Sequence, residues 1–301
     1  MSARVISLVN FKGGVGKTAL AVNVAVALTA QFGKEVLVVD LDPQSNASIW
    51  LMGIQEWHLK ANKHKEMSVY GLLMGISSVD QCIVRSPVQN GDGDIQLKRL
   101  DLIPSSYHLM DFQETYRWRV GKTPWYLSFY RQLKSVFSAY EYILIDCPPD
   151  LYKTTQCAIF SADSIIVPCN TDALSYIGLQ LLAKKVRSFG QQVSNDLANE
   201  RPGKGVPLIS GIIINNVQES HKKANRLSVA HFDQLLNNIK RRGDASPSAR
   251  VFETRVRNTA AFKTGTFEFR PLLFTADHNE SLLDDYRNIA SLLINELGKS
   301  P

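Results

Sequence analysis

Residues 11–18 read FKGGVGKT and bring glycines, two lysines and a threonine together. Glycine allows a loop to turn its backbone N–H groups toward an anion and to approach it closely. Lys17 offers a positive charge to the outer phosphates of a nucleoside triphosphate, and the Thr18 hydroxyl is a ligand for Mg²⁺. The pattern predicts a P-loop that binds ATP. Its expected binding residues are Lys12, Gly13, Gly14, Val15, Gly16, Lys17, Thr18 and Ala19.

The spacing differs from the standard P-loop pattern, GxxxxGK[ST], at the first glycine. Phe11 stands at that position, and an additional lysine, Lys12, follows it. The apolar run before the loop and the helical spacing after it supply the strand–loop–helix context that a P-loop requires. A glycine-rich turn with chance lysines is the alternative, and this context argues against it.

Acidic side chains close two further apolar runs. EVLVVD leads into Asp40 and Asp42, and EYILID ends at Asp146. A carboxylate at the carboxyl end of a buried strand beside a P-loop is placed to hold the water shell of Mg²⁺. Each aspartate alone could instead cap the next helix, but three such residues favour metal and water chemistry. We expect a magnesium site made by Thr18, Asp42 and Asp146, partly through water.

Short β-branched runs alternate with helical patterns along the chain. The runs that predict buried strands are 4–10, 35–40, 100–104, 141–146, 164–169 and 208–216, with a short edge strand at 271–275. A helix is expected over 17–31, and an amphipathic helix over 281–297. This alternation predicts an α/β fold, a three-layer P-loop NTPase whose mostly parallel, twisted sheet is covered by helices on both faces.

The domain organisation follows from the same pattern. We expect a single domain over residues 1–301, with insertions around 53–98 and 190–207. The first insertion contains NGDGD at 90–94, which predicts a turn, and the second reads as an exposed connection. Neither carries enough apolar sequence for a second core.

Composition is that of an ordinary soluble globular protein, with 45% hydrophobic and 21% charged residues in a chain of 301. No apolar stretch is long enough for a membrane span or a signal peptide, which predicts a cytoplasmic protein. Four cysteines lack the CxxC spacing of a metal site, so buried reduced thiols are expected.

The net charge of +6 has one location. Residues 219–270 hold eleven Lys or Arg against five Asp or Glu, so this stretch accounts for the whole surplus. A basic region of this kind often meets a polyanion. A solvated positive face is the alternative, and charge alone does not separate the two.

Four motifs in this order resemble the ParA/MinD superfamily of deviant Walker ATPases, and ParA most of all. They are VNFKGGVGKTALAVNVAVALT, VLVVDLDPQSNAS, YILIDCPPD and VPCNTDALSYIGLQLL. The resemblance covers residues 4–51, 100–110 and 141–182, and more weakly 208–216 and 251–297. One departure is VFETRVRN, which lacks the proline of the Pro-Arg-Asn triplet common in the family and is one residue shorter.

The resemblance implies a role for each matching residue. Lys12 is the signature lysine, which reaches across an ATP-sandwiched dimer to the partner's phosphates and neutralises charge there. With Lys17 and Asp42 it forms the expected catalytic set, in which Asp42 orients the attacking water. Asp40 supports the magnesium site, and Asp146 holds Mg²⁺ through water. The adenine contact falls to Asn215 or Asn216.

The function implied is that of a timed switch. A ParA-like ATPase hydrolyses ATP to ADP and phosphate, dimerises on ATP binding and binds DNA nonspecifically. With a ParB-like adaptor it positions or segregates a plasmid, a chromosome or a protein cargo on the nucleoid. The residues expected to contact DNA are Lys222, Lys223, Arg226, Arg241, Arg242, Arg255 and Arg257.

Two other readings stay open. A MinD-like positioning ATPase would dock on a membrane through a basic amphipathic C-terminal helix. Here that helix bears Asp284, Asp285 and Glu296, which anionic lipid would repel. A nucleotide-gated scaffold with negligible turnover is the non-enzyme reading, and the retained Lys12, Lys17 and Asp42 argue for hydrolysis instead.

Overall fold

An eight-stranded sheet forms the centre of the computed structural model, which describes residues 2–88, 97–112, 123–217, 222–258, 270–274 and 280–296. The strands are β1 Arg4–Leu8, β2 Val36–Asp40, β3 Val84–Arg85, β4 Leu100–Ile103, β5 Tyr142–Asp146, β6 Ser164–Cys169, β7 Ile209–Val217 and β8 Ala245–Arg257. Their order is β3-β4-β2-β5-β1-β6-β7-β8, and every neighbouring pair is parallel except β3 with β4.

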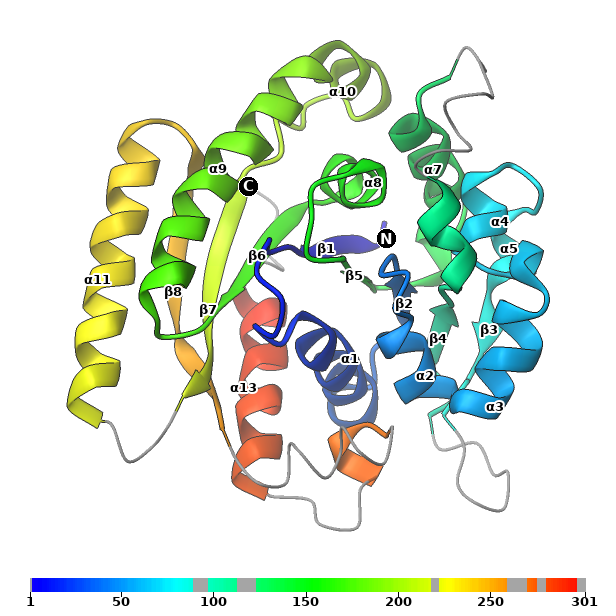
Figure 1. The fold of residues 1–301 in the computed structure, drawn as a ribbon, viewed down its shortest axis with the longest axis horizontal. Coiled ribbons are helices and arrows are strands. Elements are labelled where there is room, and N and C mark those ends of the chain that lie inside the picture. The colour runs from blue at the N-terminus through cyan, green and yellow to red at the C-terminus, as the bar shows by residue number, and fades with distance from the viewer. Residues whose placement is uncertain are drawn as a thin grey trace.

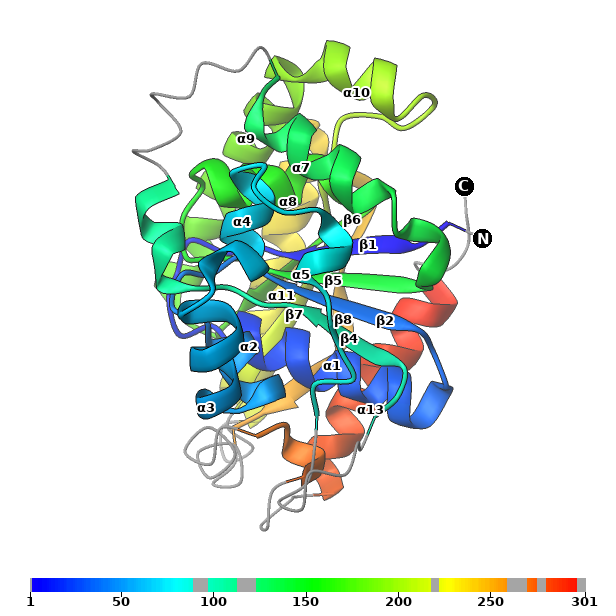
Figure 2. The same ribbon diagram turned by 90° about the vertical axis from the view of Figure 1, so that its right-hand side faces the viewer.

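Helices cover both faces of this sheet. Those described are α1 Lys17–Phe32, α2 Asn46–Met52, α3 Ile54–Trp57, α4 Val69–Leu73, α5 Val79–Cys82, α7 Trp125–Lys134, α8 Lys153–Ser161, α9 Ala173–Gln192, α10 Ser194–Glu200, α11 Lys222–Arg241 and α13 Glu280–Glu296. Figure 1 shows α1 and α13 on one side of the sheet and α8 and α9 on the other. The same separation is visible after a quarter turn (Figure 2), so the three-layer α/β prediction is confirmed.

The central strands are buried on both faces, which explains their continuous apolar sequences. Every residue of β2, β5 and β6 is buried. Two apolar cores result, one under α1, α2 and α13 and the other under α4, α7, α8 and α9. A parallel sheet requires this double cover because its strands present apolar side chains in both directions.

Helix α1 is fixed at both ends by left-handed glycines. Gly33 follows its last turn with φ 63°, and its N–H donates to the Thr29 carbonyl. A residue with positive φ is the usual way to satisfy the last carbonyls of a helix, and glycine adopts it without steric cost. At the other end, Gly16 caps the helix with φ 83°. The start of α1 is thereby fixed relative to the loop that precedes it.

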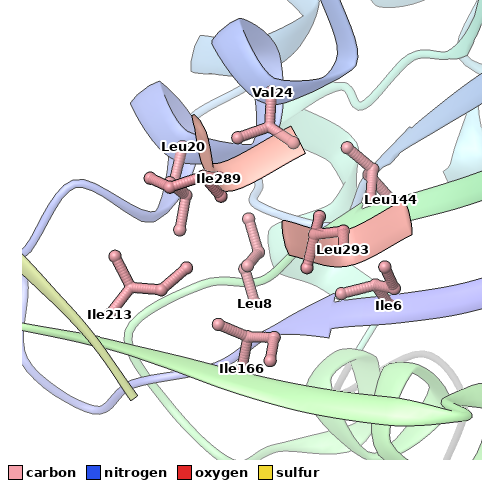
Figure 3. Close-up of a pocket in the computed structure, with 9 residues that line it drawn as sticks. All are labelled: Ile6, Leu8, Leu20, Val24, Leu144, Ile166, Ile213, Ile289 and Leu293. Carbon is pink, nitrogen blue, oxygen red and sulfur yellow. The ribbon is translucent and has the colours of Figure 1, made fainter. Parts of the chain in front are cut away.

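Helix α13 packs α1 onto the sheet. Figure 3 shows Leu20 and Val24 of α1 facing Ile289 and Leu293 of α13 above the strands. The gap among these side chains is only about 10 Å³ and is lined by apolar groups alone, so it is a packing gap in the core. The closing helix predicted for 281–297 is therefore confirmed, and it holds α1 in place below the P-loop.

Two predictions about the C-terminal half are wrong. The edge strand predicted for 271–275 is wrong over its described part, because Leu272–Phe274 is a short 3₁₀ helix. The described sheet has β8, paired with β7, at one edge and β3 at the other. The stretch 190–207 is largely helical instead of an exposed connection: α9 extends to Gln192 and α10 follows.

Residues 53–88 of the first insertion form short elements that pack on the sheet. Buried side chains of α4 and α5, such as Leu72 and Cys82, belong to the same core as α7 and α8. The turn predicted at 90–94 lies outside the described residues.

Candidate active site

The loop between β1 and α1 has the backbone geometry of an anion cradle. Gly14 and Gly16 have φ of 71° and 83°, a region that residues with a side chain rarely adopt. No side chain caps α1, and its first turn contains no acidic residue. The N–H groups of that turn and the positive end of the helix dipole are therefore available to a phosphate.

Lys17 lies inside this cradle. Its side chain is buried, and its Nζ donates to the carbonyl oxygens of Asn10 at 3.1 Å and Lys12 at 3.3 Å. Burial lowers the pKa of Lys17, and the nearby negative charges of Asp146 and Asp42 oppose that change. Both hydrogen-bond acceptors are neutral, so a phosphate oxygen would be the stronger partner for this ammonium group.

Asp146 is a buried carboxylate without a conventional partner. It ends β5, is fully buried and stands beside Asp40 of β2 in the sheet register. Neither of its carboxylate oxygens accepts a hydrogen bond of standard geometry. Burial and the charge of Asp40 raise the pKa of Asp146 well above its ordinary value, whereas the nearby Thr18 hydroxyl and Lys17 lower it.

These groups fit the magnesium ion that the sequence predicts. An unpaired buried carboxylate is costly, and a cation beside it would remove that cost. Thr18 lies close to Asp146, as the expected ligand pair requires. The described residues contain no closed cage of three His, Cys, Asp or Glu side chains. Magnesium bound with a nucleotide needs none, because waters and phosphate oxygens complete its octahedron.

Asp40 lies beside Asp146 and is hydrogen-bonded within its own chain. It is fully buried and accepts hydrogen bonds from the Asp42 N–H at 3.0 Å, the Ser48 N–H at 2.9 Å and the Ser48 hydroxyl at 2.6 Å. These bonds join the end of β2 to the first turn of α2. Burial raises the pKa of Asp40 to about 7. Asp40 thus fixes the loop that contains Asp42 to the start of α2.

Asp42 faces the cleft beside the P-loop. It is 7% exposed and accepts a hydrogen bond from the Gln44 N–H at 2.9 Å, which fixes its carboxylate. Burial raises its pKa. The cleft has a volume of about 280 Å³. Its lining residues are Gly13, Gly14, Gly16, Lys17, Thr18, Ala19, Asp42, Gln44, Asn46, Trp50 and Pro149.

Four of these lining residues were not predicted from the sequence: Gln44, Asn46, Trp50 and Pro149. The first three follow Asp42 in the segment DPQSN and in α2, and Pro149 follows Asp146. Their proximity in the chain to predicted aspartates was the available signal. The structure therefore extends the site along the two loops that leave β2 and β5.

Lys12 lies at the rim, where its side chain binds Asp172 at the start of α9. Its Nζ is 2.5 Å from Asp172 Oδ2, and its backbone N–H donates to Asn10 Oδ1 at 3.0 Å. The Lys12 side chain is 31% exposed. Lys12 does not line the cleft, whereas Gly13 and Lys17 do.

The two asparagines considered for adenine differ in their surroundings. Asn215 is buried, and its Nδ2 donates to the Val15 carbonyl at 2.7 Å. Asn216 is exposed and has φ of 59°. Neither lines the cleft of the P-loop, so the structure brings Asn215 to the loop's backbone rather than to the cavity.

The seven residues predicted to contact DNA belong to the two ends of α11 and to β8. Lys222, Lys223 and Arg226 belong to the first turns of α11, where the side chains lie outside the described part. Arg241 ends α11, a helix of 20 residues, and Arg242 follows. At 1.5 Å per residue the two ends are about 30 Å apart. Figure 1 shows α11 at the outer edge of the molecule beside β8.

The two arginines of β8 also differ. Arg257 is anchored to α13, because its backbone N–H and its guanidinium bind the two carboxylate oxygens of Asp285 at 3.0 and 3.1 Å. Arg255 is half-buried on the same strand. Arg241 and Arg242 are exposed. Arg257 therefore has a partner in its own chain that competes with phosphate. Arg255 also lies near an acidic group: burial raises the pKa of Asp233, and the charge of Arg255 opposes that change.

All four cysteines are buried and carry free thiols, as the sequence predicted. None of the helices in the described part of the chain is both long enough and apolar enough to cross a bilayer.

Comparison with known proteins places these features in a family. A family model described as AAA domain matches residues 3–199. The chain is 33% identical to the sporulation initiation inhibitor protein Soj of Bacillus subtilis over 197 residues, which is 65% of this chain and 70% of Soj. It is also 33% identical to the chromosome partitioning protein ParA of Caulobacter vibrioides over 186 residues, 61% of this chain and 62% of that protein.

Solved structures share the fold. The ATP complex of a single-residue variant of Cyanothece McdA aligns with a TM-score of 0.71 and 17% identity, covering 100% of this chain and 98% of that one. Cobyrinic acid a,c-diamide synthase of Mycobacterium smegmatis, with bound ADP and magnesium, aligns with a TM-score of 0.66 and 21% identity, covering 99% and 96%. These structural neighbours thus bind ATP, or ADP with magnesium.

Proposed function

The chain belongs to the AAA domain family of P-loop ATPases of the ParA/MinD type, and on this premise we propose that it is an ATP-dependent partition switch. In this proposal ATP joins two copies of the chain, and the dimer binds DNA without sequence preference. An adaptor of the ParB kind then stimulates hydrolysis, which releases the dimer. The cargo is a plasmid, a chromosome or a protein assembly, and the site of action is the nucleoid in the cytoplasm.

The proposal of an ATP dimer is supported above all by the position of Lys12. A lysine in a phosphate loop that served its own nucleotide would face its own cleft, as Lys17 does. Lys12 instead lies at the rim, partly exposed and bound to Asp172. From this position the Lys12 side chain can reach the phosphates bound by a second subunit. Its positive charge would act there as an arginine finger does.

Residues of the cleft suit the hydrolysis step. The start of α1 and Lys17 bind the phosphates, and Asp42, fixed by the Gln44 N–H, orients the attacking water. Asp146 and Thr18 hold Mg²⁺, which neutralises charge on the phosphate oxygens when it is bound. The rate in the single chain is expected to be slow, because the cleft is completed only by the partner's Lys12.

The basic part of the chain supports the DNA proposal. The family model ends at residue 199, whereas the charge surplus lies in residues 219–270. Two moderate basic surfaces joined in one dimer double the number of phosphate contacts, and nonspecific affinity rises steeply with that number. ATP would therefore control DNA binding through dimerisation alone.

The experiment combines light scattering with DNA binding. The Asp42→Ala variant should bind ATP without turnover, form a dimer with ATP but not with ADP, and bind DNA only in the ATP form over a series of salt concentrations. Lys12→Ala should remain monomeric or hydrolyse poorly. A mass that is independent of nucleotide, or DNA binding that ignores ATP, contradicts the switch. Dimerisation and DNA binding with no phosphate release from the unmodified chain would identify a nucleotide-gated scaffold.

A further inference from the structure

The side chain of Asn215 contacts the phosphate loop from a strand that is not adjacent to it. In the sheet, β6 lies between β7 and β1, yet Asn215 Nδ2 of β7 donates to the Val15 carbonyl at 2.7 Å. Asn215 is 6% exposed, and Val15 is 1% exposed. The hydrogen bond is therefore formed in the interior, where an unpaired carbonyl would be costly.

Both ends of the Asn215 amide are engaged. While Nδ2 binds the loop, the Oδ1 atom accepts the N–H of Asn216 at 2.9 Å. Asn216 has φ of 59°, and asparagine tolerates this left-handed conformation better than most residues. The turn at the end of β7 thus orients the amide so that its donor faces Val15.

Gly16 fits closely against the same amide. A Cβ atom at Gly16 would lie 1.8 Å from Asn215 Nδ2 and 3.1 Å from its Cγ. Gly16 is thus required for close approach as well as for its φ of 83°. The Gly16 carbonyl also accepts the first hydrogen bond of α1, from the Leu20 N–H at 2.9 Å. Asn215 therefore contacts the loop at the point where it becomes the helix.

We propose that Asn215 is a positioning residue for the phosphate loop. Its hydrogen bond holds the Val15 carbonyl in the interior, away from an anion that this oxygen would repel. The N–H groups of the residues that follow Val15 can then point toward the phosphates. Asn215 is absent from the lining of the cleft, which agrees with action through the loop and not by contact with the nucleotide.

A ligand without a base separates this role from an adenine contact. Calorimetry would compare Mg·ATP with Mg·tripolyphosphate on the full chain and on Asn215→Ala. We expect both ligands to bind about ten-fold more weakly to the variant, the effect of one lost buried hydrogen bond. The Kd values for ATP and GTP should rise by the same factor. Undiminished tripolyphosphate binding with weakened ATP binding would overturn the proposal, and so would unchanged binding of both.

Two further variants protect the test from a general loss of folding. Asn238→Ala removes an exposed asparagine side chain from α11, away from the phosphate loop, and it should bind both ligands normally. Gly16→Ala should weaken binding, and its effect should be smaller when residue 215 is already alanine, because the clash is gone while the strain at φ 83° remains. Equal effects of Gly16→Ala in the two backgrounds would contradict the steric coupling. These measurements concern nucleotide binding by the single chain, so they do not depend on the dimer or on DNA.

Discussion

The Lys12 ammonium group and the Asp172 carboxylate form an ion pair of 2.5 Å that joins the phosphate loop to the start of α9. Asp172 is the N-cap of α9, where its Oδ1 accepts the Ser175 N–H at 2.8 Å while Oδ2 accepts Lys12. Although partial burial raises the pKa of Asp172, the hydrogen bond from Lys12 lowers it overall. The pair holds Lys12 on its own subunit, so the proposed dimer would have to break it for Lys12 to reach the partner's phosphates.

The first prediction concerns this ion pair. Asp172→Asn keeps a good N-cap but removes the charge that holds Lys12. Because an exposed pair contributes at most about 1 kcal/mol, the dissociation constant of the ATP dimer should fall about two- to five-fold. Light scattering over a protein dilution series measures it. Glu141→Gln is a matched control, since the Lys34–Glu141 pair has 29% and 40% exposed side chains against 31% and 41% here. Equal effects of the two variants would contradict the prediction.

The second prediction concerns Asp146. Asp146→Asn should reduce Mg²⁺-dependent phosphate release by at least about a hundred-fold, because the carboxylate is expected to hold the metal's water shell. The same substitution should stabilise the chain without nucleotide by about 1–3 kcal/mol at pH 8, because it removes a buried charge whose desolvation outweighs its attraction to Lys17. Thermal denaturation and a phosphate assay measure the two effects. A variant that is less stable and still active would refute the assignment of Asp146.

The third prediction concerns pH and follows from Asp40. Burial raises the pKa of Asp40 from 3.8 to about 7 in the folded chain. Between these values the folded state binds more protons than the unfolded state, so the contribution to stability is present at low pH and is lost as the pH rises toward 7. Asp42 and Asp146, whose pKa values burial also raises, act with the same sign.

Denaturation of the chain without nucleotide from about pH 5 to about pH 8 measures this dependence. Asp40→Asn should flatten part of the decline, because the substituted side chain does not titrate. A slope unaltered by Asp40→Asn would show that Asp40 is not the titrating group.

The fourth prediction separates the two ends of α11. If the dimer binds DNA through the exposed end of this helix, Arg241→Ala with Arg242→Ala should lower the slope of log affinity against log salt by about two per subunit. Lys222→Ala with Lys223→Ala tests the other end in the same way. Arg257→Ala is expected to lower stability more than DNA affinity, because Arg257 binds Asp285. A larger loss of DNA affinity for Arg257→Ala than for both pairs would contradict this assignment.

Some helices and strands could not be predicted because their residue patterns do not indicate one structure without the contacts made in the folded chain. Strand β8, ASPSARVFETRVR, contains a proline and many polar residues, which is tolerated at a sheet edge but gives a weak strand signal. Helix α10 is short and polar, and contacts with residues distant in the sequence hold it in place. Arg201, which follows it, donates to the Ala162 carbonyl at 2.8 Å and to Asp163 at 2.7 Å.

The sequence by itself determined the chemistry of the phosphate loop, because that chemistry is local. Strand, glycine turn, lysine and helix N-terminus follow one another within Arg4–Phe32, and each residue's type limits its backbone or its charge. The tertiary structure alone decided which distant groups act on the loop. Asn215 meets Val15 across 200 positions and Asp172 meets Lys12 across 160. Such contacts depend on the order of parallel strands in the sheet, which no local pattern records.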